Sequence, residues 1–208
     1  MKKWFVSAKK ADFTEIGKKF DITPMTARII RNRDVVGDEQ IRKYLQGSTA
    51  DLYSPWDLSG MREGTALLQQ TILNGEKIRI IGDYDIDGVC ATYILLTGLK
   101  KIGANVDTVI PDRIKDGYGI NEHLIDGAKE DGVQVIVTCD NGIAAGSQIA
   151  YAKELGMKVI VTDHHEVPFE EKENGRVKKL PPEDVNINTK QEGCHYPWKG
   201  ICGGAVAW

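Results

Sequence analysis

From Lys77 to His165 the chain alternates short runs of β-branched residues with stretches of helical pattern. The apolar runs are IRII at 78–81, VIVT at 135–138 and VIVT at 159–162. Runs of this length are too short for helices and too continuous for a sheet that water wets on one face. The alternation therefore predicts an α/β fold with a parallel sheet flanked by helices on both sides.

The segment before this series has a different pattern. Residues 11–47 read as short helices, with Thr23 as a cap and Pro24 at the first helical position of one of them. A helix-turn-helix DNA reader is an alternative for these helices, but nothing marks a recognition helix. Residues 51–59 are typical of a linker, and residues 60–73 of an amphipathic helix. We expect a helical leader and linker over 1–59 and the α/β domain over 60–208.

Polar residues gather where each predicted strand ends. In parallel sheets ligands bind beyond the carboxyl ends of the strands, so these residues are the candidates for chemistry. In strand order they are Asp83, Asp85 and Asp87, then Asp112 and Arg113, then Asp140 and Asn141, then Asp163, His164 and His165.

The string GDYDIDG at 82–88 places three carboxylates two residues apart. Three like charges this close need a divalent cation or strong hydrogen-bond donors. A calcium loop is disfavoured because its twelfth position would be Ile94 instead of a bidentate Glu. An acidic turn that caps the following helix remains open, although one Asp would suffice for it. Mg²⁺ or Mn²⁺ with oxygen ligands fits best.

The string DHH at 163–165 adds two imidazoles to this edge. Adjacent residues of an extended chain point in opposite directions, so we expect one His to bind metal and the other to contact substrate. An imidazole ligand favours Mn²⁺ over Mg²⁺, which prefers an all-oxygen shell. Asp140 alone would mean little, because Asp-Asn-Gly is also a common turn.

Together, GDYDIDG, TCDNG at 138–142 and TDHH at 162–165 resemble the DHH phosphoesterase superfamily. GDYDIDGV with RIKDGYGI at 113–120 resembles, within it, the RecJ family of single-strand DNA exonucleases. The resemblance implies two divalent cations, Mn²⁺ or Mg²⁺, and hydrolysis of single-stranded DNA from 5′ to 3′ in repair and recombination. It also implies partners such as a single-strand binding protein and a helicase.

The resemblance assigns roles to individual residues. It implies that Asp140 bridges two metals. It also implies that His165 faces the scissile phosphate with support from Asp163, and that the loop around Arg113 approaches the substrate. The implied metal ligands are Asp83, Asp85, Asp87, Asp140 and His164; the implied catalytic residues are His165 and Asp163; the implied substrate contacts are Arg113, Gly117, Tyr118, Gly119 and Asn141.

The sequence departs from the family pattern after His165, where no acid has the setting of the fourth-motif aspartate. We therefore expect an N-terminal part of a longer protein, without that motif and a second DNA-gripping domain, and with reduced activity or none. Two other functions stay open. One is a DHH enzyme for small substrates, such as a nanoRNase, a cyclic dinucleotide phosphodiesterase or a pyrophosphatase; the other is a receiver-type phosphorelay module.

Composition restricts where and how such a protein works. The net charge of −3 argues against binding nucleic acid through a general basic surface, so DNA must be held locally. No apolar stretch is long enough for a membrane helix, and the first residues lack the apolar core of a signal peptide. The 4 cysteines lack CxxC spacing, which argues against disulfides or zinc. We expect a cytoplasmic protein.

Overall fold

The computed structural model describes residues 3–4, 9–117, 119–172 and 175–208. The chain divides into two compact units, Met1–Leu52 and Tyr53–Trp208. This division falls inside the segment that the sequence predicts as a linker. Two short 3₁₀ turns occur in that region, η1 at Thr49–Asp51 and η2 at Pro55–Asp57.

The first unit consists of short helices, as predicted. Its α-helices are α1 (Phe13–Phe20), α2 (Pro24–Asn32) and α3 (Asp38–Gln46). The Thr23 hydroxyl accepts a hydrogen bond from the Thr26 amide at 3.1 Å, which confirms the predicted cap of α2. Ala27, Ile30 and Ile41 are buried and form the small core of this unit.

The second unit contains a sheet of five parallel strands, in the order β2-β1-β3-β4-β7. The strands are β1 (Lys77–Ile81), β2 (Asn105–Val109), β3 (Val133–Cys139), β4 (Lys158–Thr162) and β7 (Val185–Ile187). The parallel sheet predicted from the sequence is confirmed. The sequence did not predict β7, because three residues are too few to show a periodicity.

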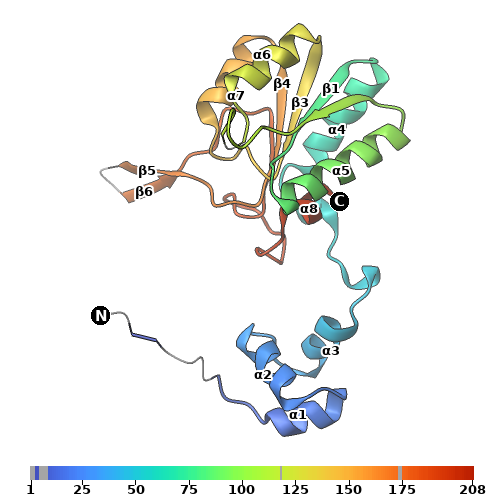
Figure 1. The fold of residues 1–208 in the computed structure, drawn as a ribbon, viewed down its shortest axis with the longest axis vertical. Coiled ribbons are helices and arrows are strands. Elements are labelled where there is room, and N and C mark those ends of the chain that lie inside the picture. Colours follow the sequence, from blue (N-terminus) through green and yellow to red (C-terminus); the bar gives the residue numbers. More distant parts are fainter. Residues whose placement is uncertain (1–2, 5–8, 118, 173–174) are drawn as a thin grey trace. The chain divides into compact units, whose positions relative to one another are not determined.

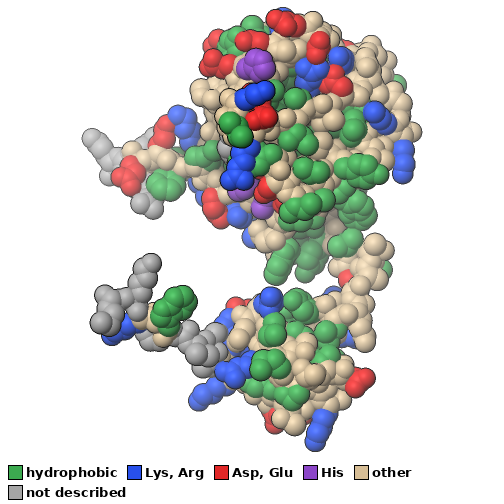
Figure 2. Space-filling view, in the orientation of Figure 1, with side chains coloured by type: hydrophobic (Ala, Val, Ile, Leu, Met, Phe, Trp, Pro, Cys, Tyr) green, Lys and Arg blue, Asp and Glu red, His purple; other side chains and the backbone are tan. Residues whose placement is uncertain are grey.

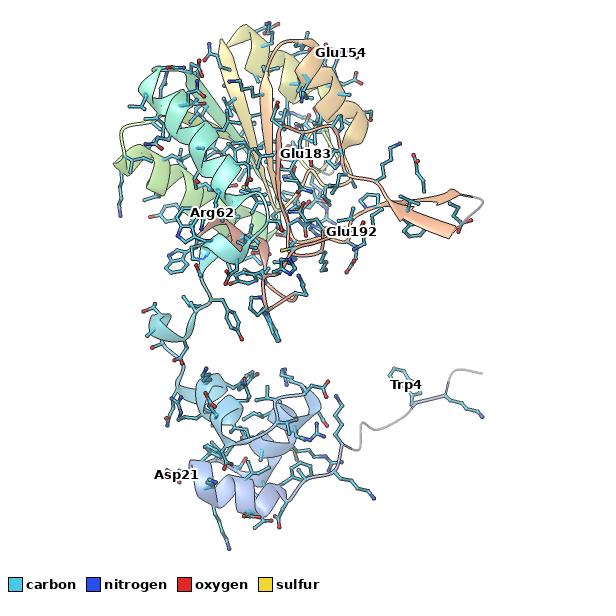
Figure 3. All side chains as sticks on the ribbon, turned by 180° about the vertical axis from the view of Figure 1, so that it is seen from behind. Trp4, Asp21, Arg62, Glu154, Glu183 and Glu192 are labelled. Atoms are coloured by element: carbon cyan, nitrogen blue, oxygen red, sulfur yellow. The ribbon has the colours of Figure 1, made fainter. Side chains whose placement is uncertain are left out.

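Helices cover both faces of this sheet (Figure 1). They are α4 (Met61–Leu73), α5 (Ile86–Lys101), α6 (Glu122–Glu130), α7 (Gly146–Glu154) and the short α8 (Gly203–Ala207). Helices α4, α5 and α8 pack on the face that carries Ile78 and Ile80. Helices α6 and α7 pack on the face that carries Ile81 and Ile136. Figure 3 shows the unit from behind, with Arg62 labelled at the start of α4.

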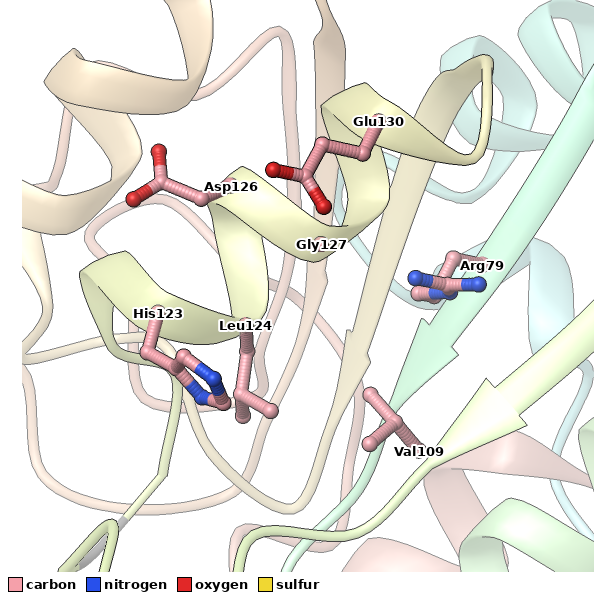
Figure 4. A pocket seen from close by; sticks show the side chains of 7 residues that line it. All are labelled: Arg79, Val109, His123, Leu124, Asp126, Gly127 and Glu130. Carbon is pink, nitrogen blue, oxygen red and sulfur yellow. The ribbon is translucent and has the colours of Figure 1, made fainter.

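On one part of the sheet, a network of ion pairs lies between the strands and the end of α6. On the face of β1 that carries Ile81, Arg79 bonds Asp107 through Nε at 2.8 Å and Nη2 at 2.7 Å, and Nη2 also bonds Asp131 at 2.6 Å. A cavity of about 400 Å³ lies beside this network. In Figure 4, Arg79 and Val109 line it from the strands and α6 lines it from the opposite side. Ion pairs take the place of apolar packing here.

A separate antiparallel hairpin follows β4. It consists of β5 (Phe169–Lys172) and β6 (Gly175–Lys178) and projects from the α/β unit in Figure 1. Acidic and basic side chains are intermixed over the face of the α/β unit that Figure 2 shows, which agrees with the absence of a general basic surface. Among the described residues no helix is long and apolar enough to span a membrane.

Candidate metal centre

The candidate metal centre lies at the carboxyl ends of the three neighbouring strands β1, β3 and β4. Asp83 follows β1, Asp140 follows β3 and Asp163 follows β4. All three side chains are buried, with exposed fractions of 2%, 1% and 1%. Buried carboxylates need a partner, so each of them has to be accounted for.

The turn between β1 and α5 is built around glycine and Asp85. A Cβ on Gly82 would lie 2.0 Å from Thr92 Oγ1, so only glycine fits where the strand turns into the helix. Asp85 Oδ1 accepts hydrogen bonds from the amides of Asp87 and Gly88 at 2.8 and 2.9 Å. Asp85 therefore caps α5, as the acidic-turn alternative requires. Capping explains Asp85 but not the other two aspartates.

The surroundings of Asp83 and Asp140 raise the pKa values of both carboxyl groups. Asp83 Oδ1 is buried and has no hydrogen-bond partner among the described residues. Burial, with a further contribution from Asp85, raises the pKa of Asp83. Burial and the charges of Asp87 and Asp85 raise the pKa of Asp140 to about 7. Both shifts indicate that the surroundings disfavour the ionised carboxylates.

Asp140 belongs to two groups of possible ligands. Asp83, Asp85 and Asp140 each offer an oxygen within 4.8 Å of the others, and Asp140, His164 and His165 each offer an atom within the same limit. Asp140 Oδ1 lies 2.9 Å from His164 Nε2. A carboxylate shared by two ligand groups has the position of a bridge between two cations. These oxygen and imidazole donors suit Mn²⁺, and Mg²⁺ on the oxygen side.

The two histidines lie side by side, contrary to the prediction from the sequence. Their ring centroids are 4.5 Å apart, and both belong to the ligand group of Asp140. The premise of opposite directions fails because β4 ends at Thr162, so both histidines follow the strand instead of continuing it. The individual roles of His164 and His165 stay predictions.

Asp163 holds His165. Asp163 Oδ1 lies 2.7 Å from His165 Nδ1, and Asp163 Oδ2 accepts a hydrogen bond from the Ile143 amide at 3.0 Å. Burial opposes ionisation, but the bonds from His165 and Ile143 outweigh it and lower the pKa of Asp163. The same bond raises the pKa of His165. Asp163 therefore orients an imidazole.

Asp87 differs from the other aspartates of its motif. Its two carboxylate oxygens accept hydrogen bonds from the amides of Gly203 and Gly204, both at 2.7 Å. Asp87 Oδ2 is also 3.5 Å from His164 Nε2. Asp87 thus lies at the edge of the centre and outside both ligand groups. Its role as a metal ligand stays a prediction.

The structure brings two of the predicted substrate residues to this edge of the sheet. The Arg113 guanidinium lies 5.3 Å from the centre of the Tyr84 ring, in the loop of the aspartate triplet. Asn141 is buried, and its Nδ2 donates to the carbonyls of Ile81 and Cys139 at 3.1 and 3.0 Å. Asn141 therefore joins the ends of β1 and β3, and its contact with substrate stays a prediction.

The predicted glycine loop is described in part. Gly117 and Gly119 have φ angles of +78° and +71°, which favour glycine. A Cβ on Gly119 would lie 3.4 Å from the Cβ of Asn141, so the loop approaches the centre. Tyr118 lies outside the described residues. Sequence reasoning missed Gly203 and Gly204, for which the only signal was the glycine pair in ICGGAVAW.

Comparison with known proteins supplies a family match. Residues 77–208 match the model of the DHH family, N-terminal domain. Two proteins named "Single-stranded-DNA-specific exonuclease RecJ" match most of the chain. The protein of Bacillus subtilis is 42% identical over 190 residues, which is 91% of this chain and 23% of that protein. The protein of Escherichia coli is 32% identical over 189 residues, 90% of this chain and 30% of that protein.

Two solved structures are similar to this chain in fold, and the names of both mention manganese or Mn²⁺. "Crystal structure of exonuclease RecJ bound to manganese" has a TM-score of 0.63 at 32% identity, covering 75% of this chain and 37% of that one. The RecJ complex with Mn²⁺ from Thermus thermophilus has a TM-score of 0.64 at 28% identity, covering 94% of this chain and 25% of that one. The chain spans about a quarter to a third of the length of these curated relatives.

Proposed function

This chain belongs to the DHH family, and from that membership we propose that it is the metal-holding catalytic part of an exonuclease that cleaves single-stranded DNA. The observation that carries the proposal is the position of Asp140, which is buried and shared by two groups of possible ligands. The RecJ names of the relatives support single-stranded DNA as the substrate over dinucleotides or pyrophosphate.

Each residue of the centre has a task in this proposal. Asp83 and Asp85 would hold one cation with Asp140, and His164 would hold a second with the same Asp140. Cations bound there would lower the pKa of a water nucleophile and stabilise negative charge on the phosphate. Asp163 accepts from His165 Nδ1, so the imidazole presents its other nitrogen to the scissile phosphate. In its protonated form, His165 would donate to a phosphate oxygen.

The substrate contacts are part of the same proposal. Arg113, held against Tyr84, would meet a phosphate oxygen with its planar guanidinium. Gly117, Tyr118 and Gly119 would let that loop approach the DNA. The resemblance alone supports the finer parts of the proposal, which are 5′ to 3′ polarity, a role in repair and recombination, a single-strand binding protein and a helicase as partners, and a cytoplasmic location.

Hydrolysis assays with and without Mn²⁺ test the proposal on this chain. We expect His164→Ala to lower Mn²⁺-dependent hydrolysis of single-stranded DNA by ~100-fold or more, because a metal ligand is lost. His123→Ala is the matched control, since that histidine is 85% exposed on α6. Wild-type hydrolysis that prefers dinucleotides or pyrophosphate would favour the small-substrate alternative. Equal activity of the wild type and His164→Ala would refute the site.

A further inference from the structure

The first turn of α8 is capped by a side chain from another part of the fold. Helix N-termini leave amide groups without partners inside the helix. The N-cap residue Cys202 makes no side-chain hydrogen bond to them. Asp87, more than a hundred residues earlier in the chain, accepts from the amides of Gly203 and Gly204 instead, with one carboxylate oxygen for each. These charge-assisted bonds attach α8 to the aspartate loop.

Gly203 also touches the bridging carboxylate. A Cβ at this position would lie 2.5 Å from Asp140 Oδ1, 2.7 Å from its Cγ and 2.8 Å from its Cβ. Rotation of the Asp140 carboxylate would not relieve these contacts, because the Cβ of Asp140 does not move with it. Gly203 is not among the described residues with positive φ, so contact and not backbone conformation requires glycine here. A side chain at this position would displace either α8 or Asp140.

We propose that Gly203 and Gly204 are positioning residues of the metal centre. Their amides fix Asp87, and the missing side chain of Gly203 lets α8 pack directly on Asp140. The proposal rests on the function proposed above, because it assumes that Asp140 binds metal. A side chain at Gly203 that moves α8 would break the bonds to Asp87, and one that moves Asp140 would displace a carboxylate that would hold the cations. Both movements weaken cation binding.

Mn²⁺ titration of the whole chain, followed by electron paramagnetic resonance and calorimetry, tests this proposal. We expect Gly203→Ala to weaken Mn²⁺ binding by ~10-fold to 100-fold, as other changes to groups that orient ligands do. Gly204→Ala should have a smaller effect, because its Cβ would lie 3.3 Å from Asp87 Oδ1. The matched control is Gly146→Ala, at the first position of α7, where a Cβ would meet nothing within 4 Å.

The outcomes separate this proposal from the one on which it rests. A wild type that does not bind Mn²⁺ overturns the proposed function. Mn²⁺ binding by the wild type and by Gly203→Ala with equal affinity overturns only the positioning role. If Gly203→Ala does not fold, Gly204→Ala decides: weaker binding than Gly146→Ala supports the role, and equal binding overturns it.

Hydrogen exchange gives a readout that needs no metal. The amides of Gly203 and Gly204 should exchange slowly in the metal-free wild type, because each is bonded to Asp87. Asp87→Ala should make both exchange at least ~10-fold faster while the amides of the central strands stay protected. Equal exchange of the two glycine amides in both proteins would show that Asp87 does not hold α8.

Discussion

Two groups of aspartates lie beside the same sheet and differ in the partners that the protein gives them. Asp107 and Asp131 contact the Arg79 guanidinium at 2.7 and 2.6 Å, and Asp107 also contacts Lys77 Nζ at 2.9 Å. Beyond the carboxyl ends of the strands, Asp83 and Asp85 form no ion pair with lysine or arginine in the part of the chain that is described, although they lie within 4.8 Å of Asp140 as a group.

The pKa values follow this difference. Hydrogen bonds from Arg79 lower the pKa of Asp107, whereas burial raises the pKa of Asp83 and raises that of Asp140 to about 7. The Arg79 network is complete within the protein and stabilises the fold. The group around Asp140 offers carboxylate and imidazole atoms that could hold a cation. Aspartates whose pKa values are raised are therefore better candidates for a metal centre than aspartates paired with arginine.

The largest expected effect is the loss of metal from Asp140→Asn. The amide keeps the shape of the carboxylate but removes the charge shared by both ligand groups, so Mn²⁺ affinity should fall by at least ~100-fold. Calorimetric titration measures this. Asp131→Asn, in the Arg79 network, is the control and should bind Mn²⁺ as the wild type does. Similar affinity of Asp140→Asn and the wild type would remove the distinction between the two groups.

Mn²⁺ itself should stabilise the folded protein. A ligand that binds only the folded state at 100 times its dissociation constant adds about 2.7 kcal/mol to the free energy of unfolding. Urea denaturation with Mn²⁺ and with a chelator measures the difference. The same experiment on Asp140→Asn should show little gain. A gain as large as that of the wild type would place the bound Mn²⁺ elsewhere.

Loss of the Arg79 network should lower the stability of the fold without changing Mn²⁺ affinity. Arg79→Met leaves Asp107 and Asp131 without their guanidinium, which should lower the free energy of unfolding by ~1–3 kcal/mol and leave Mn²⁺ affinity unchanged. Lys153→Met is a control from a more exposed pair with Asp184, where the loss should stay below ~1 kcal/mol. Reduced Mn²⁺ affinity in Arg79→Met would show that the two regions are coupled.

The sequence predicts the strands and helices around the centre because their periodicity is local. It does not predict the Arg79 network, since nothing in IRII shows that Arg79 meets Asp107 on the next strand. It predicts the edge at which Asp83, Asp140 and the histidines meet, because parallel strands order their ends. It misses Gly203 for the same reason as Arg79, because the close approach of α8 to Asp140 joins segments distant in sequence.

The smallest expected effect is that of Asp140→Asn on the pH dependence of the stability of the metal-free protein. The pKa of Asp140 is raised to about 7 from 3.8, so the folded state binds more protons than the unfolded state between these values. Stability contributed by the neutral carboxyl is complete below pH 3.8 and is lost as the pH rises through about 7. Asp140→Asn does not titrate and avoids this loss.

Paired thermal melts of the wild type and Asp140→Asn, in chelator at pH 6 and pH 8, isolate this contribution because every other group titrates in both proteins. The melting temperature of Asp140→Asn relative to the wild type should rise by ~3–5 °C between the two pH values, about 1 kcal/mol. A carboxylate compensated like Asp107, whose pKa is lowered, would give no such rise in this range. A constant difference between the two proteins would therefore mean that Asp140 is already neutralised within the protein, as the Arg79 network is.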